Sequence, residues 1–294
     1  MRDCEKKILV LGAKGNLGSC LVEAFSGNGK YEVYSWTRKE CDVTNLIDLR
    51  KKLVLLKPDV VINTVAYNAV DLCEYELSEQ EKAILLNITL VEVLANVCSD
   101  IGAKLIQFST NYVFDGTKDY YKEDDEVKPI NFYGLTKVYT EKIVQYYMKI
   151  GLSACIIRVS NLFGPKGLSP SSKPSFFEHI LNSVGNKEFL EVVNDEFFCF
   201  TYTRDIAEKL LDMLDGKEFE GIYHFVNSTS ISWYEAAVIF CKLQELPIEI
   251  KPVESESLER KARRPKNATL ISTRTTPLRN FKEAMEEYIC DYLK

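Results

Sequence analysis

Short apolar runs alternate with amphipathic stretches through the first 160 residues of the chain. The runs with the length and composition of strands cover Lys7–Leu11, Tyr31–Trp36, Asp59–Asn63, Lys104–Ser109 and Ser153–Val159. The stretches with helical spacing cover Asn16–Phe25, Thr44–Leu55 with Thr44 as the expected N-cap, Ser78–Ile101 and Asn131–Ile150. Strands that alternate with helices predict right-handed crossovers and a parallel sheet covered on both faces.

The pattern becomes irregular after residue 160. Residues 164–174 are rich in Gly, Pro, Ser and Lys, which predicts a surface loop or lid. Regular periodicity returns in the helices Ser175–Val184, Thr203–Leu214 and Ser232–Leu243 and in the strand Gly221–Asn227. We therefore expect an α/β fold, with a Rossmann-type doubly wound parallel sheet and a smaller, mixed α/β C-terminal substrate lobe. The dinucleotide-binding domain would comprise residues 1–160, with 195–228 returning to it, and the substrate lobe would comprise 161–194 and 229–294.

Composition narrows the class of protein further. The chain has 294 residues and a formal net charge of −6, which gives no electrostatic footprint for nucleic acid. No apolar run approaches the roughly 18 residues that span a bilayer, and the first residues lack the long apolar stretch of a secretory signal. Nine scattered cysteines without a CxxC pair are typical of reduced thiols. These features predict a cytoplasmic protein without a membrane or nucleic-acid partner.

A glycine-rich turn follows the first predicted strand and opens the first helix. Gly12, Gly15 and Gly18 have the spacing that allows a tight turn, close approach of the backbone to a pyrophosphate, and close helix–sheet packing. The helix N-terminus adds free N–H groups and a partial positive charge for phosphates. Simple turn chemistry is the alternative, but the position between a strand and a helix favours a dinucleotide site.

The end of the second strand distinguishes the two nicotinamide cofactors. An acidic residue there holds the ribose hydroxyls of NADH, whereas an arginine accommodates the 2′-phosphate of NADPH. Here Arg38 and Lys39 stand at that end, and Asp42 follows four residues after Arg38. The sequence favours NADPH, with NADH as the second choice and solvated loop charges as the plain alternative.

Three side chains are candidates for proton chemistry. Tyr133 and Lys137 lie four residues apart on a predicted helix, so they share a face. A nearby ammonium favours the phenolate and lowers the pKa of a tyrosine from about 10, so that it can protonate a ketone oxygen. Thr110 follows the fourth strand, at the carboxyl edge where such sheets place ligands, and can orient the same oxygen. A Tyr-x-x-x-Lys pair alone is usually a packing coincidence.

The two histidines, His179 and His224, leave little room for histidine chemistry. His224 lies in the strand-like run 221–226, which predicts a core histidine rather than a ligand. We expect no metal site.

Four segments together resemble a known family. They are the glycine-rich turn, residues 66–71 (AYNAVD), residues 109–116 (STNYVFDG) with 133–137 (YGLTK), and residues 263–268 (RRPKNA). The chain resembles the extended short-chain dehydrogenase/reductases, and among them the dTDP-4-dehydrorhamnose reductases, from about residue 7 to 275. The resemblance implies Thr110, Tyr133 and Lys137 as the catalytic set, and Asn87 as a structural and proton-relay residue.

The resemblance also implies binding residues. Those expected along the cofactor are Gly12, Gly15, Asn16, Leu17, Arg38, Asp42, Val43, Ala66, Tyr67, Tyr133 and Lys137. Those expected to face the sugar nucleotide are Tyr112, Asn161, Arg263 and Arg264. Arginine suits this role because its planar guanidinium matches phosphate geometry.

The departures from the family pattern concern sugar recognition. Asn161 stands where the family has a tryptophan that contacts the sugar, and Asn111 stands where it has an aspartate. Residues 195–201 (DEFFCFT) lack the usual Gly and Pro, and the loop 165–174 is longer than typical. The cofactor and catalytic motifs are intact, so these departures bear on which sugar is bound.

The resemblance implies the NADPH-dependent reduction of a 4-keto-6-deoxy sugar nucleotide, with dTDP-4-dehydro-L-rhamnose giving dTDP-L-rhamnose as the default. One alternative is a non-catalytic NADP-binding regulatory subunit similar to that of methionine adenosyltransferase. Another is a sugar-nucleotide epimerase or dehydratase, although Asn111 removes the carboxylate that a dehydratase needs there. A homodimer is common among the extended short-chain enzymes.

Overall fold

A six-stranded sheet forms the centre of the molecule. The computed structural model describes residues 6–169, 172, 174–216 and 219–293. The strands are β1 Lys6–Leu11, β2 Tyr31–Trp36, β3 Val60–Asn63, β4 Lys104–Thr110, β5 Ala154–Val159 and β10 Gly221–His224, in the spatial order β10-β5-β4-β3-β1-β2. All the neighbouring pairs are parallel. The predicted doubly wound parallel sheet is therefore confirmed.

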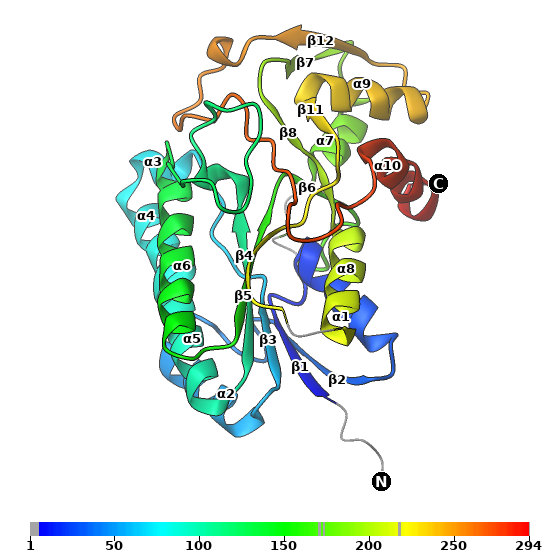
Figure 1. The fold of residues 1–294 in the computed structure, drawn as a ribbon. Coiled ribbons are helices and arrows are strands. Elements are labelled where there is room, and N and C mark those ends of the chain that lie inside the picture. The colour runs from blue at the N-terminus through cyan, green and yellow to red at the C-terminus, as the bar shows by residue number, and fades with distance from the viewer. Residues whose placement is uncertain (1–5, 170–171, 173, 217–218, 294) are drawn as a thin grey trace.

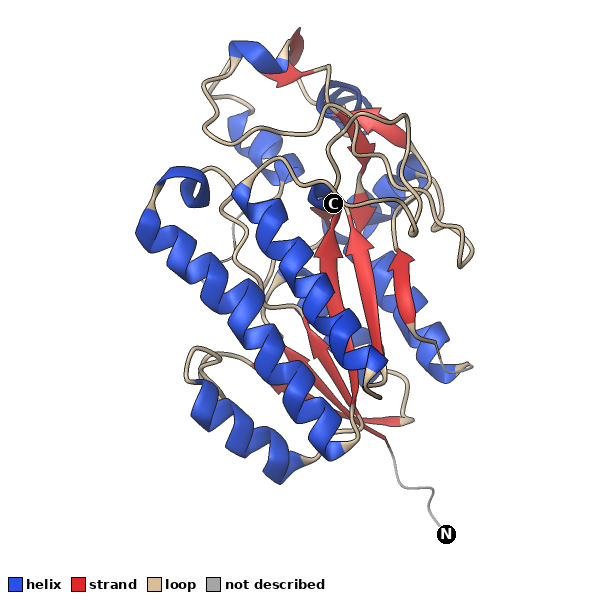
Figure 2. Cartoon of the chain, turned by 60° about the vertical axis from the view of Figure 1, so that its left-hand side comes forward, coloured by secondary structure: helices blue, strands red, loops and turns tan. Residues whose placement is uncertain are grey.

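Two layers of helices cover this sheet (Figure 1). Helices α1 Asn16–Ser26 and α8 Thr203–Asp215 lie on one face; α2 Leu46–Leu56, α5 Leu90–Ile101 and α6 Phe132–Lys149 lie on the other. The second layer stands in front of the strands in Figure 2. Along β1, Ile8 and Val10 pack toward α1, whereas Leu9 and Leu11 pack toward α5. The continuous apolar strands thus build two cores, one on each face.

The predicted helix over Ser78–Ile101 is continuous, but its hydrogen-bonding pattern changes for one turn. It consists of α4 Leu77–Ile84, a π-helical turn η1 Leu85–Thr89, and α5, and the short helix α3 Leu72–Tyr75 precedes it. By length and composition alone, residues 77–101 pass for a membrane-spanning helix. The sequence predicts no such segment, and packing explains part of the apolar composition, because Leu90, Leu94 and Cys98 are fully buried in the core.

The predicted N-cap of α2 is wrong by one residue. Asn45, not Thr44, caps the helix, because the Asn45 Oδ1 accepts a hydrogen bond from the Asp48 N–H at 3.1 Å. The Thr44 hydroxyl instead donates to the Asp42 carboxylate at 2.8 Å. The turn before the helix therefore engages the hydroxyl that the cap would have used.

A second group of short elements lies beyond the carboxyl end of the sheet (Figure 1). It contains helices α7 Phe176–Ser183, α9 Trp233–Leu243 and α10 Phe281–Tyr292, the strand pairs β6 Leu162–Phe163 with β9 Thr201–Tyr202, β7 Phe189–Val193 with β12 Glu249–Val253, and β8 Phe197–Cys199 with β11 Ser230–Ser232. The single-turn helices η2 Asn111–Val113 and η3 Ser255–Ser257 complete the described elements. Its aromatic core includes Phe163, Phe177 and Phe240. Within 195–228, β8 pairs with β11 here, whereas α8 and β10 belong to the central sheet and its helices.

Two smaller predictions are confirmed by burial. His224 lies in the core, and its Nδ1 is 2.9 Å from the Ile271 carbonyl oxygen. Burial lowers the pKa of His224 to about 4, so the ring is neutral at physiological pH. The eight cysteines among the described residues are unpaired, and seven of them are buried as small apolar side chains.

The glycine-rich turn fixes how closely α1 approaches the sheet. Gly12 has a φ of +77°, which favours glycine. A Cβ at Gly18 would lie 2.2 Å from the Gly12 carbonyl oxygen, so the first turn of α1 packs directly on the turn that precedes it. The N–H groups of Gly12 and Ala13 donate to the Trp36 carbonyl oxygen at 3.2 and 3.3 Å. This ties the glycine-rich turn to the end of β2.

We expect Gly18→Ala to destabilise the protein, because its Cβ has no room beside the Gly12 carbonyl. The free energy of unfolding in urea should fall by about 1–3 kcal/mol or more. Gly27→Ala is the matched control: Gly27 ends the same helix with a φ of −74°, and its Cβ would lie 3.5 Å from the nearest atom. The control should stay within about 1 kcal/mol of the wild type. Equal stabilities for the two variants would contradict this account.

Candidate active site

Thr110, Tyr133 and Lys137 meet at the carboxyl edge of the sheet. Thr110 ends β4, and the other two lie one turn apart at the start of α6. Asn131 begins that helix, since its Oδ1 accepts a hydrogen bond from the Gly134 N–H at 2.7 Å. A Cβ at Gly134 would lie 2.2 Å from the Tyr112 carbonyl oxygen. Only a glycine there lets α6 come this close to the segment that follows Thr110.

The Tyr133 phenol and the Thr110 hydroxyl are neighbours. Contrary to the predicted lowering by Lys137, burial raises the pKa of Tyr133 to about 12, and a hydrogen bond with Thr110 opposes this shift. Thr110 also accepts a hydrogen bond from the Tyr112 N–H at 3.2 Å. Two hydroxyl groups are therefore directed to one point at the sheet edge, an arrangement that suits a carbonyl oxygen between a proton donor and an orienting donor.

Lys137 is buried beneath this pair. Its Nζ donates to the Phe108 carbonyl oxygen at 2.7 Å, and its side chain is almost inaccessible to solvent. Burial lowers the pKa of Lys137 to about 8, and the nearby Glu141 carboxylate opposes this effect. The ammonium is the predominant form at neutral pH.

Asn87 connects the segment after β3, at Tyr67, to helix α6, at Thr136. It lies in the π-helical turn η1, where its Oδ1 accepts from the Tyr67 N–H at 2.8 Å. Its Nδ2 donates to the Tyr67 carbonyl oxygen at 3.0 Å and to the Thr136 hydroxyl at 2.9 Å. All of its amide contacts hold backbone and helix in place, so the structural role expected of Asn87 is clear in the geometry.

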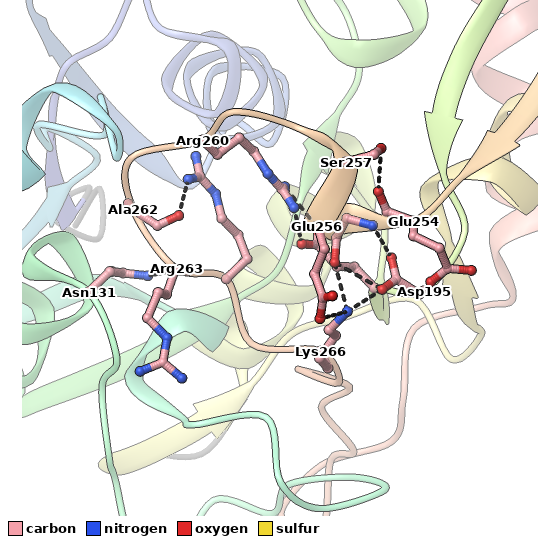
Figure 3. Close-up of polar contacts among 12 residues, drawn as sticks. Asn131, Asp195, Glu254, Glu256, Ser257, Arg260, Ala262, Arg263 and Lys266 are labelled. Carbon is pink, nitrogen blue, oxygen red and sulfur yellow. Dashed lines mark hydrogen bonds and ion pairs between the residues drawn. The ribbon is translucent and has the colours of Figure 1, made fainter.

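Tyr112 lies beside Tyr133, and it connects Tyr133 to the segment that carries Arg263 and Arg264. The Tyr112 and Tyr133 rings meet edge to face with centroids 6.1 Å apart, and Tyr112 is also a hydrogen-bond partner of Arg264. Arg264 makes a two-pronged ion pair with Asp71, at 2.6 and 2.5 Å. The exposed Arg263 guanidinium has no polar partner among the residues that the structure describes, and it points away from the ion pairs of its loop (Figure 3). The two arginines are thus placed differently.

Ion pairs fix the loop that carries these arginines. Arg260 pairs with the buried Glu196, and Lys266 pairs with Asp195 (Figure 3). Asn131 donates from its Nδ2 to the Arg263 carbonyl oxygen at 2.8 Å, which links the loop to the first turn of α6. The loop 260–266 is therefore held from both lobes beside Tyr133.

The glycine-rich turn has the geometry of a phosphate cradle. Gly15 is the N-cap of α1 and offers no side chain to its free N–H groups, while Leu17 is buried behind them. A Cβ at Gly12 would lie 2.6 Å from the Thr64 hydroxyl oxygen, so a larger residue would fill the cradle. These residues fit a dinucleotide whose pyrophosphate approaches the start of α1.

The first part of the predicted loop 164–174 is hydrogen-bonded to the glycine-rich turn and the start of α1. The Gly167 N–H donates to the Asn16 Oδ1 at 3.2 Å, and the Ser169 N–H donates to the Lys14 carbonyl oxygen at 3.0 Å. The part of the prediction that concerns residues 170, 171 and 173 lies outside the described residues.

The remaining predicted cofactor residues follow the ends of β2 and β3 along the same edge. Arg38 is exposed after β2, and Asp42 accepts hydrogen bonds from the backbone and hydroxyl of its own turn. Val43 packs partly against the α5 core. Ala66 is exposed after β3, and the Tyr67 hydroxyl donates to Glu79. Asp42 is thus engaged locally, which leaves Arg38 free to meet a ligand.

Asn161 stands where β5 ends and β6 begins. Its backbone carbonyl accepts from the Thr201 N–H at 2.9 Å. The Asn161 Nδ2 and the neighbouring Ser160 hydroxyl are buried and have no partner among the described side chains and backbone. Buried polar groups of this kind are normally satisfied by water or a ligand.

Sequence reasoning missed the groups that hold this site together. Asp71 was recognised only as part of a motif, and its pairing with Arg264 spans 193 residues. Glu196 and Glu141 gave no spacing that sets them apart from surface carboxylates.

The sheet order, the glycine-rich turn and the Thr110, Tyr133 and Lys137 arrangement define an extended short-chain dehydrogenase/reductase. Within that class, the family model of the RmlD substrate binding domain matches residues 6–294, and the chain belongs to this family.

Similar proteins agree with this assignment. The spore coat polysaccharide biosynthesis protein SpsK of Bacillus subtilis is 33% identical over 288 residues, covering 96% of each chain. A dTDP-4-dehydrorhamnose reductase of Aggregatibacter actinomycetemcomitans is 32% identical over 281 residues, covering 91% of each. The crystal structure of a dTDP-4-dehydrorhamnose reductase of Bacillus anthracis, in complex with NADP, has a TM-score of 0.89 at 26% identity and covers 98% of this chain and 100% of that one. A methionine adenosyltransferase 2 subunit beta of Xenopus laevis is 31% identical, over 85% of this chain and 76% of that protein.

We expect Asp71→Asn to weaken substrate binding, because Arg264 loses its carboxylate partner and the loop 260–266 loosens. The KM for a sugar nucleotide should rise about five-fold, with kcat nearly unchanged. Arg264 holds the pKa of Asp71 at about 2, so the ion pair persists below the ordinary pKa of an aspartate and is lost only as the pH falls through about 2. The effect on KM should therefore be constant across neutral and mildly acidic pH.

Asp124→Asn is the control for this prediction. Asp124 forms a comparable ion pair with Arg274, at 2.5 Å, on a different part of the surface. Steady-state kinetics should show an unchanged KM in this control. A KM that rises equally in both variants would contradict the placement of Arg264 at the substrate site.

Proposed function

We propose that this protein catalyses the NADPH-dependent reduction of a 4-keto-6-deoxy sugar nucleotide, with dTDP-4-dehydro-L-rhamnose as substrate and dTDP-L-rhamnose as product. The observation that carries the proposal is the contact of the Thr110 and Tyr133 hydroxyls above the buried Lys137, at the sheet edge that also holds the glycine-rich turn. Relatives named dTDP-4-dehydrorhamnose reductase, at 31–32% identity, support the substrate class.

The residues have distinct tasks in this reaction. NADPH, when bound, supplies the hydride that reduces the ketone carbon. Tyr133 gives its hydroxyl proton to the ketone oxygen, which becomes the product hydroxyl. The Thr110 hydroxyl, which donates to the Asn111 Oδ1 in this structure, would turn its proton to the same oxygen and orient it. The Lys137 ammonium stabilises the phenolate that Tyr133 leaves behind. The chain thus contributes position and electrostatics, and the cofactor carries the redox step.

The neighbour of Thr110 favours a reductase over a dehydratase. A dehydratase needs an additional carboxylate for acid–base work beside this threonine. Here the position is held by the buried Asn111, whose Oδ1 accepts from the Thr110 hydroxyl at 3.2 Å. Its Nδ2 donates to the Ala268 carbonyl oxygen at 3.4 Å, so the amide is a fixed structural group.

The cofactor preference rests on the end of β2. Arg38 is exposed there without a competing ion pair among the described residues, and it can meet the 2′-phosphate that distinguishes NADPH from NADH. Gly12, Gly15, Asn16 and Leu17 would receive the pyrophosphate at the start of α1.

The orphaned Asn161 amide supports contact with the substrate. Its buried Nδ2 lies at the end of β5, on the edge that carries the proposed catalytic residues, and a sugar hydroxyl would supply an acceptor for it. Arg263 and Tyr112 would face the nucleotide part, with Arg263 as the guanidinium free to bind phosphate.

We expect Tyr133→Phe to lower kcat by about 100-fold or more, since it removes the proton donor and keeps the ring. The measurement is NADPH consumption with dTDP-4-dehydrorhamnose, with the product identified by mass spectrometry. Tyr139→Phe is the control, because Tyr139 lies on the same helix but is 53% exposed. It should retain wild-type activity. If Tyr133→Phe keeps wild-type kcat, Tyr133 is not the acid.

The relative that is named a methionine adenosyltransferase subunit supports a second candidate, a cofactor-binding regulatory subunit. Tight NADPH binding without turnover of any keto-sugar nucleotide by the wild type would favour that function and overturn the proposed one.

A further inference from the structure

A buried carboxylate, Glu141, lies directly behind the proposed catalytic residues. It follows Tyr133 and Lys137 at the same four-residue interval on α6, so the three share one face of the helix. Its side chain is only 3% exposed. The Ser109 hydroxyl donates to its Oε1 at 2.6 Å, and Ser109 directly precedes Thr110 in β4. One carboxylate therefore contacts the strand that ends in Thr110 and belongs to the helix of Tyr133.

The same carboxylate binds a buried arginine. Arg158 donates from Nε to Oε1 at 2.9 Å and from Nη2 to Oε2 at 2.8 Å, and it is 2% exposed. Arg158 reaches further with Nη1, which donates to the Glu123 carbonyl oxygen at 3.1 Å and lies 3.3 Å from the His224 Nε2. Its guanidinium also stands over the Phe114 ring. These contacts leave Arg158 no freedom to move, so it fixes Glu141.

Charged and titratable groups on several elements surround Glu141. Tyr133 and Lys137 lie on the same helix, Arg158 on β5 binds Glu141, and the neutral His224 on β10 lies next to Arg158. Glu123, on the segment before α6, keeps its negative charge, since hydrogen bonds from Thr273 outweigh the effect of burial and lower its pKa. Among the described residues, Glu141 is the charged side chain that opposes the lowering of the Lys137 pKa by burial. Without it, that effect of burial would lose its counterweight.

We propose that Glu141 is a positioning residue of the reaction, which keeps the Lys137 ammonium charged and holds Ser109, and through it Thr110, in place. The role of Glu141 in catalysis rests on the proposed function. Glu141 touches neither substrate nor cofactor and acts through its neighbours. Burial has already brought the pKa of Lys137 down to about 8, so the loss of a buried negative charge would leave the amine largely neutral at physiological pH.

The test is the pH dependence of kcat/KM in Glu141→Gln. The alkaline limb of the profile should move down by about one pH unit or more, and kcat/KM at mildly alkaline pH should fall about ten-fold relative to the wild type. Glu141→Asp retains the charge, so its alkaline limb should stay near the wild-type position even where its kcat is lower. An unshifted limb in Glu141→Gln would overturn the proposal, because a purely structural role lowers activity at every pH alike.

Ser109→Ala separates position from charge. It removes the hydrogen bond to Glu141 but no charge, so kcat should fall about three-fold with the alkaline limb unchanged. A limb that moves as far in Ser109→Ala as in Glu141→Gln would contradict the electrostatic role.

Glu141→Gln leaves the Arg158 guanidinium buried without its partner, which strongly destabilises a fold. If that variant does not fold, Glu141→Gln combined with Arg158→Met removes both charges and still deprives Lys137 of its anion. Its alkaline limb must also move down, and an unmoved limb again overturns the proposal.

A binding measurement keeps this test independent of turnover. The pH at which NADPH affinity falls, followed by fluorescence titration, should lie about one unit lower in Glu141→Gln than in the wild type and in Glu141→Asp. If the wild type binds NADPH but turns over no keto-sugar nucleotide, the proposed function fails, and this titration still decides whether Glu141 controls the charge of Lys137.

Discussion

The buried ion pair between Glu141 and Arg158 is the interaction on which the edge of the sheet depends. It joins α6 to β5, accepts a hydrogen bond from β4 through Ser109, and reaches β10 through His224. Removing one partner from a pair of this kind costs about 3–5 kcal/mol, because the remaining charge is left uncompensated. This ion pair lies directly behind Thr110, Tyr133 and Lys137, so its loss would disturb the positions of these three side chains.

Close backbone approaches complete that constraint. Gly134 brings α6 against the Tyr112 carbonyl, and Gly18 brings α1 against the Gly12 carbonyl. The first approach brings Tyr133 close to the segment that follows Thr110, and the second shapes the glycine-rich turn, for which we propose pyrophosphate binding. In both cases glycine permits a close approach of two backbone segments that any side chain would block.

The second group of elements, beyond the carboxyl end of the sheet, contacts the candidate site through charged and polar residues and not through its aromatic core. Its aromatic cluster packs on its own, while Arg264 crosses to Asp71 and Asn131 holds the Arg263 backbone. These few contacts place the loop 260–266 beside Tyr112. Because these contacts are polar and partly exposed, they hold the loop without contributing to the core of the sheet.

The sequence alone predicted the alternation of strands and helices in the first 160 residues, the glycine-rich turn and the four-residue spacing of Tyr133 and Lys137, because each of these is a local pattern of apolar periodicity or fixed spacing. It placed the cap of α2 at Thr44, where Asp42 competes for the hydroxyl, and it did not predict α10 or the strands β7 and β12. Tertiary structure decided which charges meet. Asp71 and Arg264 are 193 residues apart, and Glu141 and Arg158 lie on different elements. No local pattern marks such pairs, since a carboxylate becomes part of a site only when folding excludes water and brings its partner to it.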